Sequence, residues 1–446
     1  MDKTDFTGIF EESLNDIIGL LAIASVYDET TSSTAMPYGS EVGKAFMYMR
    51  EKAQKDGFRT EEYDGHALSV SFGKGNERID IACHLDVVAA DAEDFDIRIK
   101  DGRIYGRGTS DMKIPAYLVY LSMKLLKEKY PDADKEIRLV LGGDEERTMN
   151  DMRHYLSRAG MPDFAFTPDG YFPLGIGEKG AIMWTIDEAY DGIIETLEGG
   201  TQCNIISPYA RAVLKDTGHL EAIRSYIEDN ETDAETYLED GRTVIEVKGI
   251  AAHASRPQLG HNATIDLLKI IADVYEDRLC KDLYDTYGDP YGRGIGSFHG
   301  EDPTECLSVN LGTLHINKGT LKAQIDCRYP YEEKAVDLTG RINNKSILPV
   351  KLDYNDDPTM CDINDPYVKV MLDTYRSITG DVSKPLVSGG VSYAKVFGHC
   401  VSFGPNEEGK PQMAHQKGEY MEIDDCIRCF GIYYHTIENL LLMKEE

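Results

Sequence analysis

The sequence predicts an α/β protein in which a mostly parallel sheet with helices on both faces is interrupted by an inserted α+β domain. Three observations lead to this fold class. Strand-like and helix-like segments alternate over the first 177 residues, a strand-rich and meandering pattern follows, and helix–strand alternation resumes near Asp365. The chain has 446 residues, which is enough for two or three domains. We therefore expect one domain from residues 1–177 plus 358–446, and an inserted domain from residues 178–357.

The first part of the chain contains the elements that suggest a parallel sheet. Three short apolar runs rich in strand-forming residues predict buried strands: residues 78–83, 136–141 and 164–167. Apolar residues at helical spacing predict two helices, residues 114–130 before a proline and residues 151–159 before a glycine. Strands that alternate with helices are typical of a sheet whose two faces are both covered.

After residue 177 the predicted pattern becomes strand-rich, and near Asp365 it returns to alternating helices and strands. In the inserted segment we expect strands at residues 243–247, 307–311 and 321–326. After it we expect a helix, a strand and a terminal helix, at residues 367–378, 400–403 and 424–443. The return to the first pattern indicates that the two ends of the chain belong to one domain.

Composition restricts the possible partners and the compartment. The formal net charge of −31 repels phosphate backbones and anionic lipids, so we expect neither nucleic acid nor membrane as a partner. The first five residues lack a basic secretory start, and the longest apolar stretch, residues 17–26, is too short to span a bilayer. The nine scattered cysteines favour a reducing cytoplasm over a disulfide framework. Cys426 and Cys429, one helical turn apart, are interpreted as core residues.

Polar side chains capable of chemistry follow the three predicted strands. They are His84 and Asp86 after the first, Glu145 and Glu146 after the second, and Asp169 after the third, with Asp111 in the glycine-containing loop 106–111. In an open α/β sheet the carboxyl ends of the strands share the edge where ligands bind. These side chains should therefore lie close together despite their separation in sequence.

Clustered carboxylates repel one another unless a cation neutralises them. Mixed imidazole and carboxylate ligands suit Zn²⁺, and also Mn²⁺ or Co²⁺. The competing interpretation is a set of solvated acidic loop residues, in which case the chain would be an acidic scaffold without metal. Another is a binding protein that kept the fold without catalysis. Loss of activity usually removes one of the side chains that carry the chemistry, and all of those named above are present here.

Nine segments between about residue 78 and residue 420 carry a resemblance to a known family, in the family's order. They are CHLDVV, GRGTSDMK, GGDEER, FTPDG, GEKG, GIAAHASRP with GHNA, DCRYP, SGGVSYAK and AHQKGEY. The chain resembles the co-catalytic zinc peptidases, which include carnosinases, aminoacylases, the ArgE and DapE deacylases and the PepV dipeptidases. GEKG, DCRYP and HQKGEY are most similar to the PepV-like branch.

The resemblance implies a metal-dependent dipeptidase that hydrolyses the amide bond of a small peptide through a metal-bridging hydroxide. An N-acyl amino acid deacylase, of the desuccinylase or aminoacylase type, is the alternative within the same chemistry. Two divalent metal ions are implied, Zn²⁺ first, with Mn²⁺ or Co²⁺ as other choices. By resemblance, His84 and Asp169 bind one ion, Glu146 and His415 bind the other, and Asp111 bridges the two.

The resemblance also assigns roles beside the ligands. Glu145 would be the general base that takes a proton from the attacking water and returns it to the leaving amine. Asp86 would fix the tautomer of the ligand His84. The peptide bond between Asp111 and Met112 is expected to be cis, as it often is in the family. Cys83 stands where the family usually has glycine, either as a space-filling bystander or as an oxidation-sensitive thiol near the metal.

Substrate-binding residues are implied in the inserted lid and in a late glycine turn. His253 would donate a hydrogen bond to the oxyanion of the tetrahedral intermediate. Asn204 and Arg328 would help to bind that oxyanion or the α-carboxylate of the substrate. Gly389 and Gly390 would let the backbone approach the substrate closely.

The size of the inserted segment bears on the assembly of the enzyme. One lid unit of four strands and two helices needs roughly 75 residues, and residues 178–357 leave room for two. In family members with shorter lids a dimer partner supplies the lid histidine. The resemblance to the enlarged-lid branch implies a monomer in which His253 acts in cis.

Overall fold

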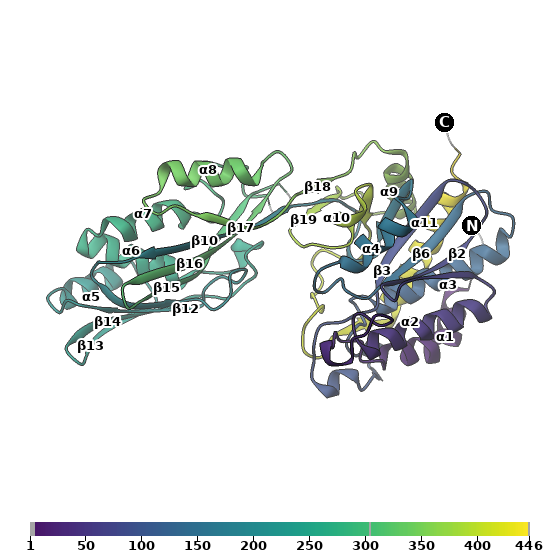
Figure 1. Ribbon diagram of the computed structural model, residues 1–446, viewed down its shortest axis with the longest axis horizontal. Coiled ribbons are helices and arrows are strands. Elements are labelled where there is room, and N and C mark those ends of the chain that lie inside the picture. Colours follow the sequence, from purple (N-terminus) through teal and green to yellow (C-terminus); the bar gives the residue numbers. More distant parts are fainter. Residues whose placement is uncertain (1–4, 303–304, 445–446) are drawn as a thin grey trace. The chain divides into compact units, whose positions relative to one another are not determined.

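The computed structural model describes residues 5–302 and 305–444 and divides into two compact units (Figure 1). Unit 1 comprises Met1–Gly177 with Met360–Glu446, and unit 2 comprises Glu178–Thr359. The first boundary is the one expected from the sequence, and the second lies two residues beyond the expected one. The chain therefore leaves unit 1 once, builds unit 2 and returns.

Unit 1 is an α/β unit built on a mixed sheet, with strands in the order β1-β2-β6-β3-β7-β20-β9-β18. The four central strands are parallel: β6 (Glu136–Gly142), β3 (Arg78–His84), β7 (Phe164–Thr167) and β20 (Cys400–Ser402). Antiparallel strands flank them: β1 (Arg59–Tyr63) and β2 (Ala67–Phe72) on one side, and β9 (Gly175–Glu178) on the other. Two short strands complete this edge, β18 (Thr359–Met360) and β19 (Leu386–Ser388). The α/β fold is confirmed, and its parallel part is the buried centre of the sheet.

Helices cover both faces of this sheet because neighbouring strand residues point to opposite sides. Ile79, Ile81 and Cys83 of β3 belong to the larger apolar core, whereas Ala82 belongs to a smaller one on the other face. The helices of the larger core are α1 (Phe6–Leu21), α2 (Ser40–Lys55), α3 (Lys113–Lys129), α9 (Pro366–Thr379) and α11 (Ile423–Leu442). The opposite face packs against α4 (Asn150–Ala159) and α10 (Ala394–Phe397).

A small three-stranded sheet joins distant parts of unit 1. It consists of β4 (Arg98–Lys100), β5 (Arg103–Tyr105) and β22 (Tyr420–Glu422), in the order β22-β5-β4. Tyr420 pairs with Tyr105, which places the segment before β22 beside the loop after β5. A further pair, β8 (Gly170–Tyr171) with β21 (Pro405–Asn406), extends the end of β7.

Unit 2 is an α+β unit with an eight-stranded sheet in the order β13-β14-β12-β11-β15-β16-β10-β17, antiparallel at every described pair. The strands are β10 (Gly180–Ala189), β11 (Ile194–Gly199), β12 (Tyr209–Leu214), β13 (Ala234–Glu239), β14 (Arg242–Lys248), β15 (Ser308–Asn317), β16 (Thr320–Tyr329) and β17 (Lys351–Asp356). The helices are α5 (Leu220–Asp229), α6 (Ala263–Tyr275), α7 (Arg278–Tyr287) and α8 (Ala335–Lys345). Within the described residues, this is twice a set of four strands and two helices.

One face of the unit 2 sheet is apolar and the other is polar. Val309 and Leu311 of β15 join the core formed with the four helices, and so does Cys327 of β16. Asn310 lies between Val309 and Leu311 on β15, and Asp326 lies next to Cys327 on β16. Both point to the other side of the sheet and are paired across the two strands. The helix-free face of this sheet therefore carries the polar side chains.

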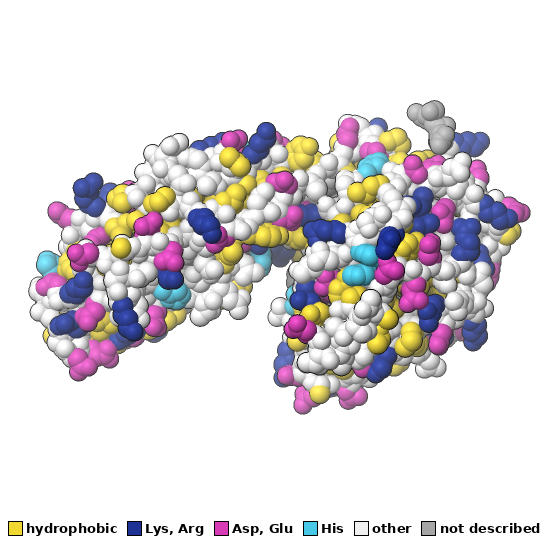
Figure 2. All heavy atoms as spheres, in the orientation of Figure 1, with side chains coloured by type: hydrophobic (Ala, Val, Ile, Leu, Met, Phe, Trp, Pro, Cys, Tyr) yellow, Lys and Arg dark blue, Asp and Glu magenta, His cyan; other side chains and the backbone are white. Residues whose placement is uncertain are grey.

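The state of the cysteines, the distribution of charged side chains and the apolar character of the helices can be compared with the expectations from composition. All nine cysteines are free, and Cys426 and Cys429 lie on the buried side of α11, in the core, as predicted. On the face shown in Figure 2, acidic side chains are spread over both units among isolated basic ones. None of the helices within residues 5–302 and 305–444 is long and apolar enough to cross a membrane.

Candidate metal and catalytic site

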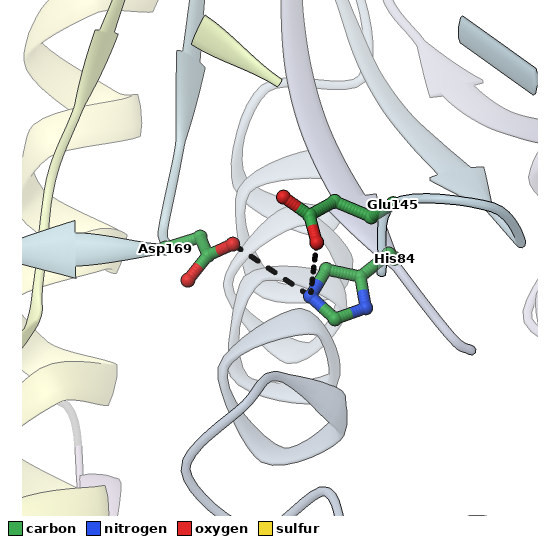
Figure 3. Close-up of side chains that lie close together, drawn as sticks. All are labelled: His84, Glu145 and Asp169. Atoms are coloured by element: carbon green, nitrogen blue, oxygen red, sulfur yellow. Dashed lines mark ion pairs between the residues drawn. The ribbon is translucent and has the colours of Figure 1, made fainter. Parts of the chain in front are cut away.

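The carboxyl ends of the central parallel strands bring three side chains together (Figure 3). His84 ends β3, Glu145 follows β6, and Asp169 follows β7. The Nε2 atom of His84 lies 3.6 Å from an Asp169 carboxylate oxygen and 4.0 Å from a Glu145 carboxylate oxygen. His84 is completely buried, so these acids surround an imidazole that water does not reach.

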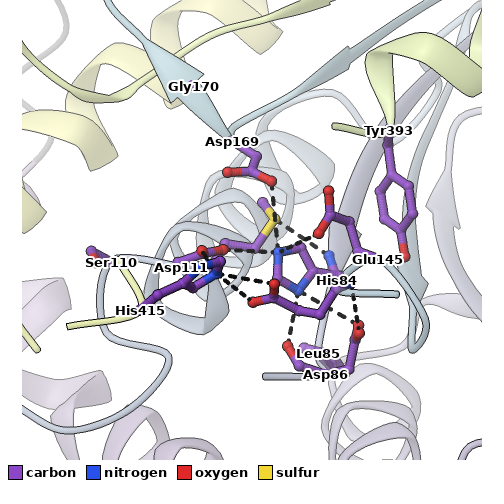
Figure 4. A network of polar contacts seen from close by, with 12 residues as sticks. His84, Leu85, Asp86, Ser110, Asp111, Glu145, Asp169, Gly170, Tyr393 and His415 are labelled. Atoms are coloured by element: carbon purple, nitrogen blue, oxygen red, sulfur yellow. Dashed lines mark hydrogen bonds and ion pairs between the residues drawn. The ribbon is translucent and has the colours of Figure 1, made fainter. Parts of the chain in front are cut away.

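The Asp111 carboxylate lies between two histidines (Figure 4). Its Oδ1 is 2.9 Å from His84 Nε2, and its Oδ2 is 3.0 Å from His415 Nε2. His415 Nε2 also lies 3.0 Å from the carboxylate of Glu146. Ligands at about 2 Å from a shared metal ion lie about 3 Å from one another. The two oxygens of Asp111 thus face two different groups of ligand atoms.

Hydrogen bonding leaves Nε2 of His84 as the atom facing this cluster. The Nδ1 atom lies 2.9 Å from the backbone carbonyl oxygen of Asp86, which can only accept, so Nδ1 carries the proton. The Asp86 carboxylate is 3.5 Å from the same nitrogen and accepts a hydrogen bond of 3.1 Å from the backbone N–H of Glu146. Asp86 therefore orients the ring mainly through its carbonyl, and its carboxylate ties two strand-end loops together.

The electrostatics of the cluster indicate an excess of negative charge. Burial first, then the neighbouring Asp169 and Glu146, hold the pKa of Glu145 well above its usual range. Burial also raises the pKa of Asp169, together with the nearby charge of Asp111. Hydrogen bonds to Asp111 and Glu146 raise the pKa of His415 to about 10. Carboxylates that resist ionisation beside histidines that retain protons fit a site completed by cations.

A buried glutamate that we did not predict holds the loop of Asp111. Glu419 is 1% exposed, and its Oε1 accepts hydrogen bonds from the Ser110 N–H at 2.8 Å and the Asp111 N–H at 3.3 Å. Its other oxygen accepts from Arg107 at 2.7 Å. Glu419 lies in the HQKGEY segment, four residues after His415, and its place in this recognised segment was the only signal in the sequence.

The loop of Glu145 and Glu146 is held by a second buried acid that the sequence reasoning missed. Asp151 accepts hydrogen bonds from the N–H groups of Gly143 at 2.7 Å and Asp144 at 2.9 Å, and one from the hydroxyl of Tyr393. A Cβ at Gly142 would stand 2.1 Å from that hydroxyl oxygen, so only glycine fits at the end of β6. Tyr393 lies in the segment SGGVSYAK, which was recognised without a role for the tyrosine.

The three predicted lid residues gather within unit 2. His253 pairs with Ile205 in an isolated bridge, and the Ala254 N–H donates to the carbonyl of Asn204 at 2.9 Å. Arg328 donates from Nε and Nη2 to the Asp326 carboxylate at 3.0 and 2.9 Å. Asp326 therefore orients the guanidinium of Arg328 by a two-pronged contact.

The remaining expectations concern backbone and packing. The Asp111–Met112 peptide bond is cis, as the resemblance implied. Gly389 and Gly390 form the turn after β19, where the Gly390 N–H donates to Ser388 Oγ at 3.0 Å. Cys83 is fully buried among apolar side chains, and burial raises the pKa of its thiol, so its packing role is the one favoured here.

An α/β unit with histidines and carboxylates at the ends of its parallel strands, and with an inserted α+β unit, defines a candidate hydrolase of the metal-binding type. Peptidase family M20/M25/M40 matches residues 81–439 of the chain. The chain belongs to this peptidase family, and the resemblance stated from its motifs is confirmed.

Relatives of similar length carry dipeptidase names. The chain is 31% identical over 457 residues to a protein named "Putative dipeptidase" from Staphylococcus aureus strain MRSA252, covering 96% of this chain and 97% of that one. It is 28% identical over 450 residues to "Putative dipeptidase YtjP" of Bacillus subtilis strain 168, with coverage of 96% and 97%.

Solved structures share the fold at low sequence identity. Human carnosine dipeptidase 1 superposes with a TM-score of 0.58 at 13% identity, covering 98% of each chain. The dipeptidase Dug1p of Saccharomyces cerevisiae superposes with a TM-score of 0.57 at 12% identity, covering 99% of each chain. These likenesses confirm the α/β fold with its inserted unit.

Proposed function

We propose that this chain is a two-metal dipeptidase that hydrolyses the amide bond of short peptides. One observation carries the proposal: the two oxygens of Asp111 lie 2.9 and 3.0 Å from the Nε2 atoms of His84 and His415. A carboxylate in this position can bridge two cations, each with an imidazole and a further carboxylate. Membership of the peptidase family and the dipeptidase names of long relatives support the reaction.

The residues present fit two divalent ions. His84 and Asp169 would hold one ion, Glu146 and His415 the other, and Asp111 both. The donor set of imidazole nitrogens and carboxylate oxygens suits Zn²⁺ first, and Mn²⁺ or Co²⁺ after it. When bound, such ions polarise the scissile carbonyl and make water a stronger nucleophile at neutral pH.

The protein's own groups handle the proton and the developing charge. Glu145 takes a proton from the attacking water and returns it to the leaving amine, and its carboxylate lies 4.0 Å from the Nε2 atom of His84, at the edge of the ligand cluster. His253 donates a hydrogen bond to the oxyanion. Arg328, oriented by Asp326, and Asn204 bind the carboxylate end of the substrate. Gly389 and Gly390 allow its backbone to lie close to the turn.

The same proposal includes assembly and location. The enzyme works as a monomer in the cytoplasm, and His253 serves the metal site of its own chain. The support is the size of unit 2, since eight described strands and four helices are twice the set that a short lid needs. A closing lid also limits substrate length, which favours dipeptides over longer chains.

A substrate panel tests the function. The protein is stripped with a chelator, reloaded with Zn²⁺, Mn²⁺ or Co²⁺, and assayed on dipeptides, tripeptides and N-acyl amino acids. We expect metal-dependent cleavage of dipeptides with a free amino group and two bound ions per chain by elemental analysis. Faster cleavage of N-acyl amino acids would identify a deacylase instead, and a stoichiometry of one ion would refute the bridging role of Asp111.

A further inference from the structure

The segment that carries His253 is fixed on one side by backbone pairing. His253 forms a bridge with Ile205, and the N–H of Ala254 donates to the carbonyl of Asn204 at 2.9 Å. On the other side of this antiparallel bridge, the N–H of Ile206 donates to the carbonyl of Ala252 at 2.9 Å. The backbone of His253 is therefore held against the segment of Asn204, as an extra strand would be.

A buried asparagine fixes that partner segment in turn. Asn310, 5% exposed on the polar face of β15, donates from Nδ2 to the carbonyls of Cys203 at 3.0 Å and Ile205 at 3.1 Å. Its own Oδ1 accepts from Asn262 Nδ2 at 3.0 Å. Because Asn262 caps helix α6, the loop of His253 is tied at both ends to regular structure. The imidazole thus starts from a fixed backbone position.

The orientation of the ring is set by one neighbour, Ser255. The backbone N–H of Ser255 donates to His253 Nδ1 at 3.1 Å, and the Ser255 hydroxyl lies 2.7 Å from the same atom. A backbone N–H can only donate, so Nδ1 must present a lone pair. The hydroxyl then also donates to Nδ1. In a neutral ring whose Nδ1 accepts, the proton lies on Nε2.

The charges around the ring keep it neutral. Partial desolvation comes first in lowering the pKa of His253, whose side chain is still exposed, and the positive charge of Arg328 comes next. Asp326 on the same strand acts in the opposite direction, and Arg256 on the loop of His253 adds to the lowering. An imidazolium would also have to place a proton on Nδ1, facing the N–H of Ser255. Both the geometry and the neighbouring charges thus exclude the imidazolium form of His253.

We propose that Ser255 is a positioning residue that holds Nδ1 of His253 as an acceptor and presents Nε2–H as a neutral hydrogen-bond donor. The inference rests on the proposed function, in which His253 meets the oxyanion. It adds that His253 stabilises charge without giving up a proton, so Glu145 alone carries the proton between water and the leaving amine. It also assigns a role to the serine of the segment AAHAS, which had none.

Nitrogen NMR tests the protonation state independently of activity. The metal-loaded protein is labelled with ¹⁵N-histidine, and the resonances of His253 are assigned by their loss in His253→Gln. At pH 7.5 we expect Nδ1 to show the shift of an unprotonated acceptor and Nε2 that of a protonated nitrogen. A protonated Nδ1, alone or with Nε2, would overturn the inference and leave the proposed function standing. Full activity of His253→Gln would instead refute the oxyanion role.

Substitution of Ser255 tests the positioning. Ser255→Ala keeps the backbone N–H but removes the hydroxyl donor, and we expect kcat to fall about tenfold with KM within about twofold. Ser255→Thr restores the hydroxyl and should recover most of kcat. Ser225→Ala removes an exposed hydroxyl from α5 of the same unit and serves as the matched control. A kcat of Ser255→Ala within twofold of both wild type and control would contradict the positioning role.

Discussion

The two units hold their candidate residues in different ways. In unit 1, His84 is completely buried at the end of a central strand, and its near neighbours are the carboxylates of the same cluster. In unit 2, His253 is exposed on a loop that is held by backbone bridges and by Asn310. The proposed metal ligand His84 is thus set by the apolar core of the sheet. The proposed substrate-binding residue His253 is set by hydrogen bonds of its loop, which allow a more open position.

The strongest test of this contrast removes the proposed base, Glu145, from the cluster of unit 1. Glu145→Gln has nearly the same shape but cannot accept a proton, so we expect the rate to fall about 10²–10⁴-fold. Both metal ions should remain, because the proposed ligands are unchanged. Steady-state kinetics and elemental analysis of the same preparation measure the two effects. Near-full turnover would show that another group takes the proton.

The corresponding test in unit 2 removes the proposed oxyanion donor, His253. His253→Ala should lower kcat about 10²–10³-fold with unchanged metal content. Mixing this variant with Glu145→Gln then tests whether the histidine acts within its own chain. If His253 acts in cis, the mixture stays inactive at every protein concentration. Partial recovery of activity would show that the histidine is supplied across a dimer.

Within the cluster of unit 1, metal affinity should depend more on Asp111, the proposed bridging acid, than on Asp86, the proposed orienting acid. Asp86→Asn keeps the carbonyl that accepts from His84 and should weaken metal binding about 10–100-fold. Asp111→Asn removes the charge between the two histidines and should weaken it further. Titration with a metal-binding dye compares the two variants. Equal metal affinities would contradict the bridging position.

The smallest predicted effect on rate concerns the support of the Asp111 loop. Glu419→Gln keeps an oxygen acceptor but leaves buried Arg107 without its charge partner, so we expect about a 3–5 kcal/mol loss of stability. The rate at saturating metal should fall by roughly tenfold or less. Glu422→Gln, which breaks the exposed pair with Arg103, is the matched control and should cost about 0–1 kcal/mol. Denaturant unfolding monitored by circular dichroism distinguishes them, and equal midpoints would contradict this role for Glu419.

The sequence predicted the parallel centre of unit 1 because its strands are short apolar runs that end in polar residues. The run 136–141 lies within β6, and the predicted helix 114–130 is shifted by one residue from α3. The N-terminal elements were not assigned: β1 is largely exposed, so its residues show no apolar run. An edge strand such as β1 depends on its pairing with β2, and no local sequence pattern reveals that pairing.

The residues of the candidate site also differ in whether a local sequence pattern could predict their positions. His84, Glu145 and Asp169 were expected to converge because the ends of parallel strands share one edge of a sheet. Asp151 and Glu419 could not be predicted in this way, because a buried acid that accepts backbone N–H groups looks like any other acid in sequence. The lid residues needed the resemblance, since their position depends on long-range pairing such as that between Ile205 and His253.

The insertion of unit 2 into unit 1 sets the order in which a newly made chain can assemble its site. Glu146 and its partner His415 are 269 positions apart, and β20 and Glu419 also lie beyond the insertion. At about 5–20 residues per second, a ribosome needs roughly 15–50 s to pass from one to the other. Until these segments have been made, the nascent sheet lacks β20 beside β7, and the Asp111 loop lacks its carboxylate support. The proposed metal centre of each molecule can therefore form only after unit 2 and the segment that carries His415 and Glu419 have been synthesised.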